Sequence, residues 1–353
     1  MKGLDILEGL AQASPLPLPS QVPSPPPDET TPDFHEYSRI VLFTSGGKDS
    51  GAALLHLLDL GVSRSKIELH HHNVDGSTNE ESFMDWPCTH GYMVAFAKAF
   101  ELPLYNSYRE GGFLREMLRE NCGTAPVTFT RGDGTVVTMG GERSKQSTRR
   151  KFPQVAAALS VRWCSSVLKV DIGSRMLVND PRFTDGKTLV ITGERAEEST
   201  NRAHYARFEP HRNDNRNGRI PRWIDHWRPV HGWSEAQVWD ILRRYRVNCH
   251  PAYQMGAISR ASCMFCIFGS KHQWATLRDI APDGFRRIAD YEREFGVTIH
   301  RKLSVDEQAD LGVSYKPDPF WVQVAMSREY KLPIFVDQWK LPPGAFGEGG
   351  GPT

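Results

Sequence analysis

The chain has 353 residues, a formal net charge of +1, 39% hydrophobic residues and 24% charged residues. This is the composition of an ordinary globular protein, so it excludes general disorder and restricts any nucleic-acid site to a local patch. No apolar run is long enough to span a bilayer, and the N-terminus lacks the basic start and small-residue cleavage site of a secretory signal. We therefore expect a cytoplasmic protein whose six cysteines are reduced.

The two ends are expected to lie outside the folded unit. Residues 1–36 are proline-rich and predict a disordered tail, and residues 341–353 are rich in glycine and predict a flexible one. Between the tails we expect a nucleotide-binding α/β domain at residues 37–232, with a hairpin and basic insertion at 122–150. A helical, cysteine-bearing region at residues 233–340 is expected to follow.

Short apolar or β-branched runs alternate with helical patterns along the first of these regions. Strands are predicted at residues 39–44, 66–74, 102–108 and 187–193, and helices from Asp49 onward, through 91–100 and over 111–121. Such alternation is typical of right-handed βαβ units, so it predicts an α/β fold with a parallel sheet sandwiched by helices. Residues 127–139 predict a β-hairpin that turns at residues 132–134.

The first predicted strand leads into a loop of glycines, hydroxyls, one cation and one carboxylate: Ser45-Gly46-Gly47-Lys48-Asp49-Ser50. The glycines permit a tight turn and a close approach of the backbone, and Asp49 or Ser50 is expected to open the next helix. Amides at a helix start, the Lys48 ammonium and the two serine hydroxyls are groups that bind phosphate. The spacing differs from that of the Walker loop. The alternative is a glycine pair that merely turns the chain.

Two later segments follow predicted strands and carry polar side chains. Asp75 stands after the second strand, where ligands of open α/β sheets lie, although an aspartate before a glycine also suits an ordinary turn. Gly193 ends the fourth strand, and Arg195 and Arg202 after it can each offer a planar guanidinium to a phosphate. The alternative there is a solvated helix start in which Glu197 and its neighbour pair with arginines.

Three neighbouring histidines suggest a metal site at first sight, but alternate side chains of a strand point to opposite faces. We therefore assign no metal to His70, His71 and His72. Two arginine-rich stretches, 143–151 and 202–228, could form a basic surface for a polyanion, or could be polar loops with ordinary salt bridges.

The residues from 234 to 245 predict a helix that serves packing. Ser234 and Gln237 form a capping box, and Val238, Ile241 and Leu242 make an apolar stripe.

The cysteines carry a second candidate site. Cys263 and Cys266 have the C-x-x-C spacing that lets two thiolates bind one metal or cluster, while Cys249 precedes them by fourteen residues. Cys164 would complete a set of four ligands. The alternative is that these cysteines are small buried hydrophobic residues.

The loop SGGKDS resembles the pyrophosphate loop of the PP-loop ATP pyrophosphatases. Three further stretches, at residues 162–170, 192–202 and 227–266, resemble the phosphoadenosine phosphosulfate (PAPS) reductase branch of that superfamily. The resemblance runs from about residue 39 to residue 269. It implies an adenine-nucleotide alpha-hydrolase-like (HUP-type) fold with a C-terminal cysteine-bearing helical region.

The resemblance also implies ligands and roles for individual residues. ATP with Mg²⁺ is expected to bind at Ser45, Gly46, Gly47, Lys48, Asp49, Ser50, Asp75 and Gly193. Lys48, Asp49, Arg195 and Arg202 are expected to be catalytic. Four cysteines at the family's positions imply a [4Fe–4S] cluster in preference to zinc, with Cys164, Cys249, Cys263 and Cys266 as ligands.

The chain departs from true sulfonucleotide reductases in three ways. Its loop is complete, it has no cysteine after Cys266, and Cys164-Ser165 stands where cluster-bearing adenylylsulfate reductases carry an adjacent cysteine pair. The combination resembles the sulfur-inserting enzyme of DNA phosphorothioation, of the Dnd or Ssp type.

We therefore expect an enzyme that forms AMP and pyrophosphate and adenylates an oxygen acceptor for sulfur insertion. Its expected partners are a nucleic acid, DNA in preference to RNA, and a cysteine desulfurase or other sulfur donor; no membrane is expected. Two alternatives stay open: a PAPS or adenylyl sulfate reductase, and a non-catalytic, nucleotide-gated subunit of a defence or modification complex.

Overall fold

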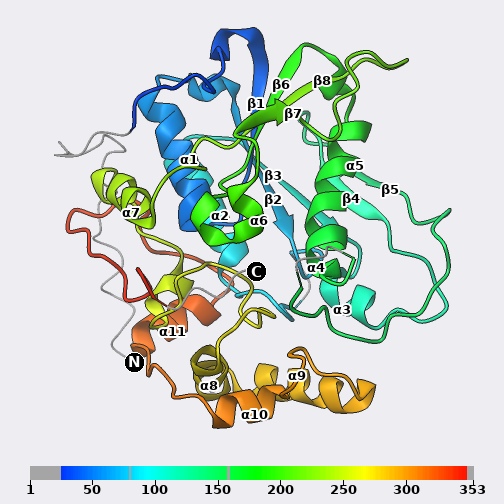
Figure 1. Cartoon of the computed structure of the whole chain (residues 1–353), viewed down its shortest axis with the longest axis vertical. Helices are drawn as coiled ribbons and strands as arrows, with labels where there is room; N and C mark the ends of the chain where they lie inside the picture. Colours follow the sequence, from blue (N-terminus) through cyan, green and yellow to red (C-terminus); the bar gives the residue numbers. More distant parts are fainter. Residues whose placement is uncertain (1–24, 79–80, 157–159, 348–353) are drawn as a thin grey trace.

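The computed structural model describes residues 25–78, 81–156 and 160–347. Within these residues a single eight-stranded sheet has the order β5-β4-β3-β2-β1-β6-β8-β7 (Figure 1). Its five central strands are parallel: β1 (Tyr37–Phe43), β2 (Ile67–Asn73), β3 (Leu104–Arg109), β6 (Lys187–Ile191) and β8 (Trp223–Trp227). This order, with crossovers on both sides of β1, is that of an α/β adenine-nucleotide alpha-hydrolase-like fold, and the predicted fold class is confirmed.

Antiparallel strands extend the sheet at both edges. The predicted hairpin is confirmed as β4 (Val127–Thr130) and β5 (Val136–Met139), and it adds to β3. Its turn contains Gly134 at a φ of +84°, a conformation that glycine adopts without strain. At the other edge β7 (Phe208–Pro210) pairs with β8. The sheet is therefore mixed, whereas the strand pattern alone predicted a parallel one.

Helices cover both faces of the sheet. One face packs its apolar residues, among them Ile40, Leu42 and Leu69, against α1 (Lys48–Asp59), α2 (Thr89–Ala99) and α7 (Glu235–Arg244). The other face packs Val41 and Val190 against α5 (Asp171–Asn179) and the hairpin. The two sets alternate along β1, as the pleat of a strand with two buried faces requires.

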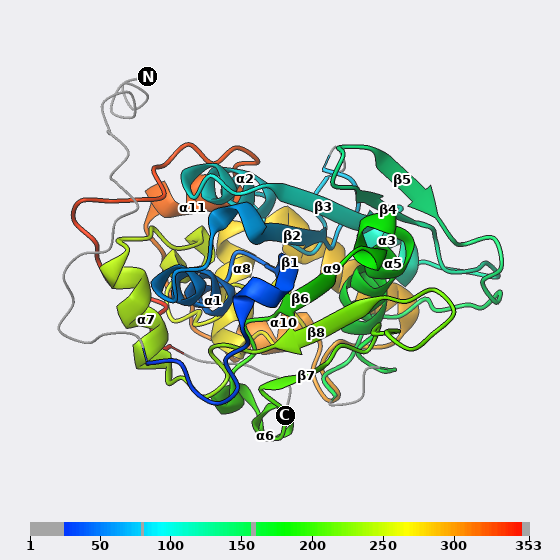
Figure 2. The same cartoon turned by 90° about the horizontal axis from the view of Figure 1, so that it is seen from above.

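A third apolar cluster lies beyond the carboxyl ends of the parallel strands. It unites residues 83–88 and 252–289 with α3 (Gly112–Met117), α4 (Trp163–Ser165) and the C-terminal helices. These helices are α8 (Lys271–Ile280), α9 (Pro282–Phe295), α10 (Val305–Asp310) and α11 (Pro319–Met326). Helices α8, α9 and α10 gather at the bottom of Figure 1, and Figure 2 shows them behind the sheet when the molecule is seen from above.

Short elements complete the chain. Between α4 and α5 the helix continues through a π-helical turn, Ser166–Val170, and α6 (Thr200–Ala203) follows a 3-10 turn at Ala196–Glu198. Other 3-10 turns lie at Phe34–Glu36, Arg64–Lys66, Pro181–Thr184 and Pro251–Gln254. No helix among the described residues is both long and apolar enough to cross a membrane.

The predicted tails are partly folded. Most of residues 1–36 and the last six residues lie outside the described ranges, but Asp28 forms an ion pair with Arg207. At the C-terminal end Gly344 donates from its amide to the carbonyl of Tyr253, and Ala345 packs on the first core cluster. Residues 341–347 thus differ from the flexible tail that their composition predicts, because this contact with the 3-10 turn at 251–254 anchors them.

Candidate functional site

The loop after β1 makes the turn that its glycines predict. Gly46 has a φ of +78°, and a Cβ atom at this position would meet the side chains of His250, Met93 and Tyr92 at 3.3 Å. The helix that follows begins at Lys48, and its N-cap is Gly47, not Asp49 or Ser50 as predicted. Gly47 has no side chain to cap the helix, and the hydroxyl of Tyr253 accepts from the Lys48 amide at 2.9 Å instead. A residue 205 positions away therefore replaces the local cap.

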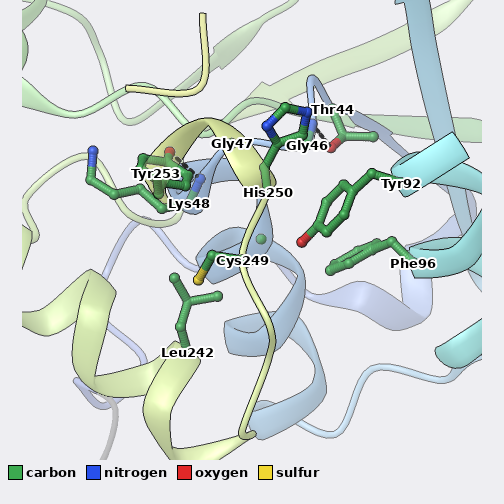
Figure 3. Close-up of a pocket in the computed structure, with 11 residues that line it drawn as sticks. Thr44, Gly46, Gly47, Lys48, Tyr92, Phe96, Leu242, Cys249, His250 and Tyr253 are labelled. Atoms are coloured by element: carbon green, nitrogen blue, oxygen red, sulfur yellow. Dashed lines mark hydrogen bonds between the residues drawn. The ribbon is translucent and has the colours of Figure 1, made fainter. Parts of the chain in front are cut away.

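Lys48 is buried and its ammonium is engaged. The Nζ atom donates to the carbonyl of Ser259 at 3.0 Å, lies 3.3 Å from Asp49 Oδ2, and lies 3.7 Å from Glu235 Oε1. Figure 3 shows this side chain extending away from Tyr92 and His250. Lys48 thus joins the loop to α7 and to the segment before the C-x-x-C motif. Its expected contact with phosphate stays a prediction.

Asp49 lies between two cations. Arg195, which follows β6, donates from Nε to Oδ1 at 2.5 Å, and Lys48 approaches Oδ2. Burial by itself would raise the pKa of Asp49, but Lys48 and Arg195 hold it below its ordinary value. The carboxylate is therefore charged, and it connects the loop of β1 with the segment after β6. Two predicted catalytic residues, Asp49 and Arg195, are brought together.

Gly193 is required by a close approach of two backbones. A Cβ atom on Gly193 would lie 2.6 Å from the carbonyl carbon of Asp49 and 2.6 Å from the amide nitrogen of Ser50. The segment after β6 therefore rests directly on the first turn of α1. This agrees with the close approach predicted for Gly193, although the partner is the loop itself.

Glu198 gathers the arginines of this segment. Its side chain accepts from the amide of Arg195 at 2.9 Å and from Arg260 at 2.8 Å, and it forms an ion pair with Arg202. Arg195 and Arg202 thus both contact Glu198, which places Arg202 near the loop. The structure therefore contains the alternative considered for this stretch, which is pairing between arginines and glutamates. These ion pairs lie close to the SGGKDS loop.

A buried polar group supports the loop from below. His250 lies 3.2 Å from the hydroxyl of Thr89 and accepts from the amide of Ala252. A cavity of about 10 Å³ separates the loop from Tyr92, Phe96 and Leu242 (Figure 3). This volume is about that of one water position, so the cavity is no nucleotide site.

Asp75 is used by the protein backbone. Its carboxylate accepts from the amides of Phe83 at 2.9 Å, Met84 at 3.0 Å and Asp85 at 2.8 Å. Asp75 therefore fixes the segment after β2 at the carboxyl edge of the sheet. Its expected position near an adenosine stays a prediction.

Three of the four predicted ligand cysteines, Cys164, Cys263 and Cys266, gather around one lysine and are called the cysteine group below. All three act on Lys169, an exposed residue of the π-helical turn. Desolvation by the surrounding protein would lower the pKa of Lys169, but the negative charge of Cys263 and Cys164 in their thiolate form raises it. Burial raises the pKa of Cys164 to about 11. Burial, together with the negative charge of Asp75, raises the pKa of Asp85 to about 7. Three thiols, one cation and one carboxyl group thus lie near one another.

Cys249 lies apart from these three cysteines. Its thiol is buried in the first core cluster and donates to the carbonyl of Val247 at 3.5 Å. Burial raises the pKa of Cys249 to about 12, against the opposing charge of Lys48. Cys249 faces the loop and the core of α1 and α7 in this structure, and the predicted four-cysteine site stays a prediction.

A [4Fe–4S] cluster and a structural zinc site each take four protein ligands, so the three cysteines do not fit either group. Among the described residues, no set of histidine, cysteine, aspartate or glutamate side chains is arranged to hold a metal ion.

The predicted basic surface is largely neutralised by ion pairs. In residues 202–228, Arg216 pairs with Asp214 and Asp225, and Arg228 pairs with Glu194 and Glu209. In the other stretch, Arg149 and Arg150 also have carboxylate partners. The alternative of polar segments with salt bridges describes both stretches better.

Residues 134–294 match the family model of the phosphoadenosine phosphosulfate reductase domain. This segment, a little under half of the chain, is similar to the PAPS reductase family. The matched segment contains residues 192–202, called the arginine segment below, as well as α7 and all four predicted ligand cysteines. It begins after the SGGKDS loop. The family match and the intact loop together support a nucleotide-binding enzyme of the PP-loop superfamily.

Other similarities to known proteins are weaker. An uncharacterised 37.8 kDa protein of Escherichia phage 186 is 30% identical over 143 residues, which are 40% of this chain and 40% of the phage protein. A structure of Candida glabrata FMN adenylyltransferase is 13% identical with a TM-score of 0.33, over 62% of this chain and 51% of that one. Its complex with FAD and pyrophosphate has a TM-score of 0.33, 12% identity, and coverage of 62% and 53%. The chain thus matches about half or less of each protein, and these TM-scores carry no functional argument.

Several residues of the site were not singled out by their sequence pattern. Tyr253, Ser259 and Arg260 contact the loop or its arginine segment, and Asp85 and Lys169 border the cysteines. Lys169 falls within the motif at 162–170, and Tyr253, Ser259 and Arg260 fall within the motif at 227–266, so the resemblance covered them. Only Asp85 lies outside every motif, five residues after the undescribed positions 79 and 80.

Proposed function

We propose that this protein is an ATP pyrophosphatase that adenylates an oxygen of a nucleic-acid backbone and prepares it for replacement by sulfur. The observation that carries the proposal is the path of residues 259–266. This segment contacts Lys48 through the carbonyl of Ser259, reaches Glu198 through Arg260, and then supplies Cys263 and Cys266 to the cysteine group. One segment therefore connects a complete nucleotide loop with a set of thiols.

In the first step, an acceptor oxygen would attack the α phosphorus of Mg–ATP, and pyrophosphate would leave. The loop backbone and the exposed hydroxyl of Ser45 would hold the departing phosphates, since donors at a helix start stabilise anions. Asp49 is already held by Lys48 and Arg195, so Mg²⁺ would be bound mainly by the nucleotide phosphates, as is common for this ion. Arg202 and Arg260 would face the acidic acceptor.

In the second step, a sulfur nucleophile would displace AMP from the adenylated acceptor. We propose that a cysteine desulfurase or similar donor loads a persulfide on one thiol of the cysteine group, and that its terminal sulfur forms the new bond. A second thiol of the group would then release the thiolated acceptor by forming a Cys–Cys disulfide, which an external thiol reduces. Burial raises the pKa of Cys164 to about 11, and the positive charge of Lys169 opposes that rise and so acts in favour of the thiolate, the reactive form of cysteine. No step is assigned to an iron–sulfur cluster, because its four ligands are not assembled.

The first step is tested by pyrophosphate and AMP release from Mg–ATP with and without single-stranded or duplex DNA. Ser45→Ala should lower release by about tenfold, because a loop donor to the leaving group is lost. Ser63→Ala is the matched control, since Ser63 is also an exposed serine next to α1 but lies at its opposite end. Equal turnover of the two variants, or no cleavage of ATP with any acceptor, would contradict the proposal. Sulfite release from an adenylyl sulfate in a thiol-dependent reaction would instead favour the reductase.

A further inference from the structure

A groove separate from the loop lies at the carboxyl edge of the sheet. It has a volume of about 740 Å³ and opens between α3, the segment after β2 and α9. Its floor is apolar, formed by Phe83, Leu114 and Leu118. The volume is within the range of small-molecule sites, which combine an apolar lining with a few polar groups.

Three arginines at and behind the wall formed by α3 share one carboxylate. Glu116 is fully buried, and it is the shared partner of Arg115 at 2.6 Å, Arg119 at 3.4 Å and Arg149 at 3.2 Å. Within the described part of the chain, these three arginines have no other carboxylate partner. Burial and the charge of Arg119 lower the pKa of Arg149 to about 10.

The opposite wall adds a fourth arginine. Arg287 on α9 stands over the ring of Phe83, with its guanidinium carbon 5.1 Å from the ring centroid, and its side chain is 41% exposed. A guanidinium over an aromatic ring offers both charge and a planar surface for stacking. The groove therefore places positive groups on two sides of an apolar floor.

Three carboxylates also line the groove, and each has partners of its own. Asp75 is occupied by three backbone amides, Glu120 pairs with Arg150, and Glu81 is a highly exposed partner of Arg287. Arg115 and Arg119 share the single buried carboxylate of Glu116, so an anion would meet its least opposed positive charge there, while at Arg287 it would compete with the exposed Glu81. The combination of guanidinium groups and an apolar, partly aromatic floor fits a phosphate group joined to a planar base.

We propose that this groove binds one nucleotide unit of a single-stranded nucleic acid, with its phosphate at Arg115 and Arg287 and its base on the apolar floor. Asp75 connects the groove to Asp85 and the cysteine group, so a bound strand would continue towards the site. Naming the strand as the acceptor rests on the proposed function. Binding of the nucleotide itself does not.

Cys122 provides a direct reporter of occupancy. It lines the groove, and its sulfur accepts from Arg115 at 3.7 Å. The full-length protein would be treated with N-ethylmaleimide, and the modification of Cys122 would be followed by peptide mass spectrometry. An oligonucleotide of ten thymidines and free dTMP are the probes. Protection of Cys122 by the oligonucleotide is expected; protection by dTMP at equal nucleotide concentration would support the groove with the free nucleotide as ligand. Equal modification with and without both probes would overturn the proposal.

Two neighbouring arginines of α9 make a matched pair for affinity measurements. Arg287→Ala should weaken oligonucleotide binding by about tenfold, as expected for one lost charged contact. Arg286→Ala removes the same charge from the next position, where the side chain pairs with Asp283 and lies outside the groove lining. Equal affinities of the two variants would contradict the proposal. Pyrophosphate release by the wild-type protein is measured separately, so loss of ATP cleavage with persistent protection of Cys122 would reject the proposed function and retain the groove.

Discussion

Arg195 reaches from the end of β6 to the first turn of α1 and donates from Nε to Asp49 Oδ1 across 2.5 Å. The guanidinium also pairs with Glu197, and its side chain is 5% exposed. Two βα connections that are far apart in the sequence are thus joined at the carboxyl edge of the sheet, where ligands of open α/β folds bind. The pair therefore gives the nucleotide loop a fixed position relative to the arginine segment.

We predict that Asp49 and Arg195 are strongly coupled in stability. Arg195→Gln should cost about 3 kcal/mol, because it leaves the partly buried Asp49 without its closest partner. A double-mutant cycle with Asp49→Asn, measured by urea unfolding, should give a coupling energy of about 1 to 3 kcal/mol. The exposed pair Arg243 and Asp240 on α7 has the same 2.5 Å separation and should give less than about 1 kcal/mol. Equal coupling energies in the two cycles would show that the Asp49–Arg195 pair stabilises the protein no more than an exposed ion pair does.

We predict that Gly193 cannot be replaced without displacing the loop. In Gly193→Ala the new methyl group would lie 2.6 Å from backbone atoms of Asp49 and Ser50, which cannot move aside as a flexible side chain can. A loss of about 1 to 3 kcal/mol of stability is expected from such overpacking. The affinity of Gly193→Ala for a fluorescent ATP analogue should fall as well, because the nucleotide loop is displaced. Gly232→Ala is the control, because its new methyl group would have no neighbouring atom within 4 Å, and it should match the wild type in both measurements.

The elements that could be predicted from the sequence are those with a complete local signal. Helix α7 has its capping box at Ser234 and Gln237 and buries Val238, Ile241 and Leu242, all as predicted. Strand β8 escaped prediction because it contains Asp225 and His226 within an arginine-rich stretch. Asp225 is satisfied by Tyr37 and Arg216, and Tyr37 belongs to a distant part of the sequence. Local polarity therefore concealed a central strand.

The site shows the same limit. Residue types and spacing indicated Asp49, Arg195 and the C-x-x-C cysteines, but they do not show which way a side chain points in the folded protein. Cys249 was grouped with the other cysteines through the family resemblance, whereas it is buried in the first core cluster, directly before the 3-10 turn at Pro251–Gln254. Lys48 was assigned to phosphate by its motif, whereas its contacts with Ser259 and Glu235 depend on tertiary structure.

We predict that His56 makes the protein less stable in acid. His56 is buried on α1, its Nδ1 has no hydrogen-bond partner among the described residues, and its ring packs at 5.0 Å on Trp233. Burial lowers the pKa of His56 to about 4, so between pH 6.5 and pH 4 the unfolded chain binds a proton that the folded protein does not. Its contribution to stability is complete above pH 6.5 and is lost as the pH falls towards 4, by up to about 1.4 kcal/mol per pH unit.

His56→Phe removes this titration and the unpaired nitrogen while keeping an aromatic ring. Urea unfolding at pH 7.5 and pH 5 should therefore show a smaller loss of stability in acid for His56→Phe than for the wild type. His204→Gln removes an exposed imidazole and serves as the control. An unchanged pH dependence in His56→Phe would mean that other buried histidines account for the acid sensitivity.

We predict that Cys249 contributes no metal ligand to the protein. Each of Cys249→Ala, Cys263→Ala and Cys266→Ala would be purified without oxygen, and iron, zinc and acid-labile sulfide would be measured after reconstitution. Cys249 lies in the core beside Lys48, whereas Cys263 and Cys266 lie with Cys164 around Lys169, so the metal content of Cys249→Ala should equal that of the wild type. Loss of iron and sulfide in Cys249→Ala as complete as in Cys263→Ala would show instead that all four cysteines bind one cluster. Such a cluster would require residues 249–266 to rearrange, and that rearrangement would change the contacts of Tyr253 and Ser259 with the nucleotide loop.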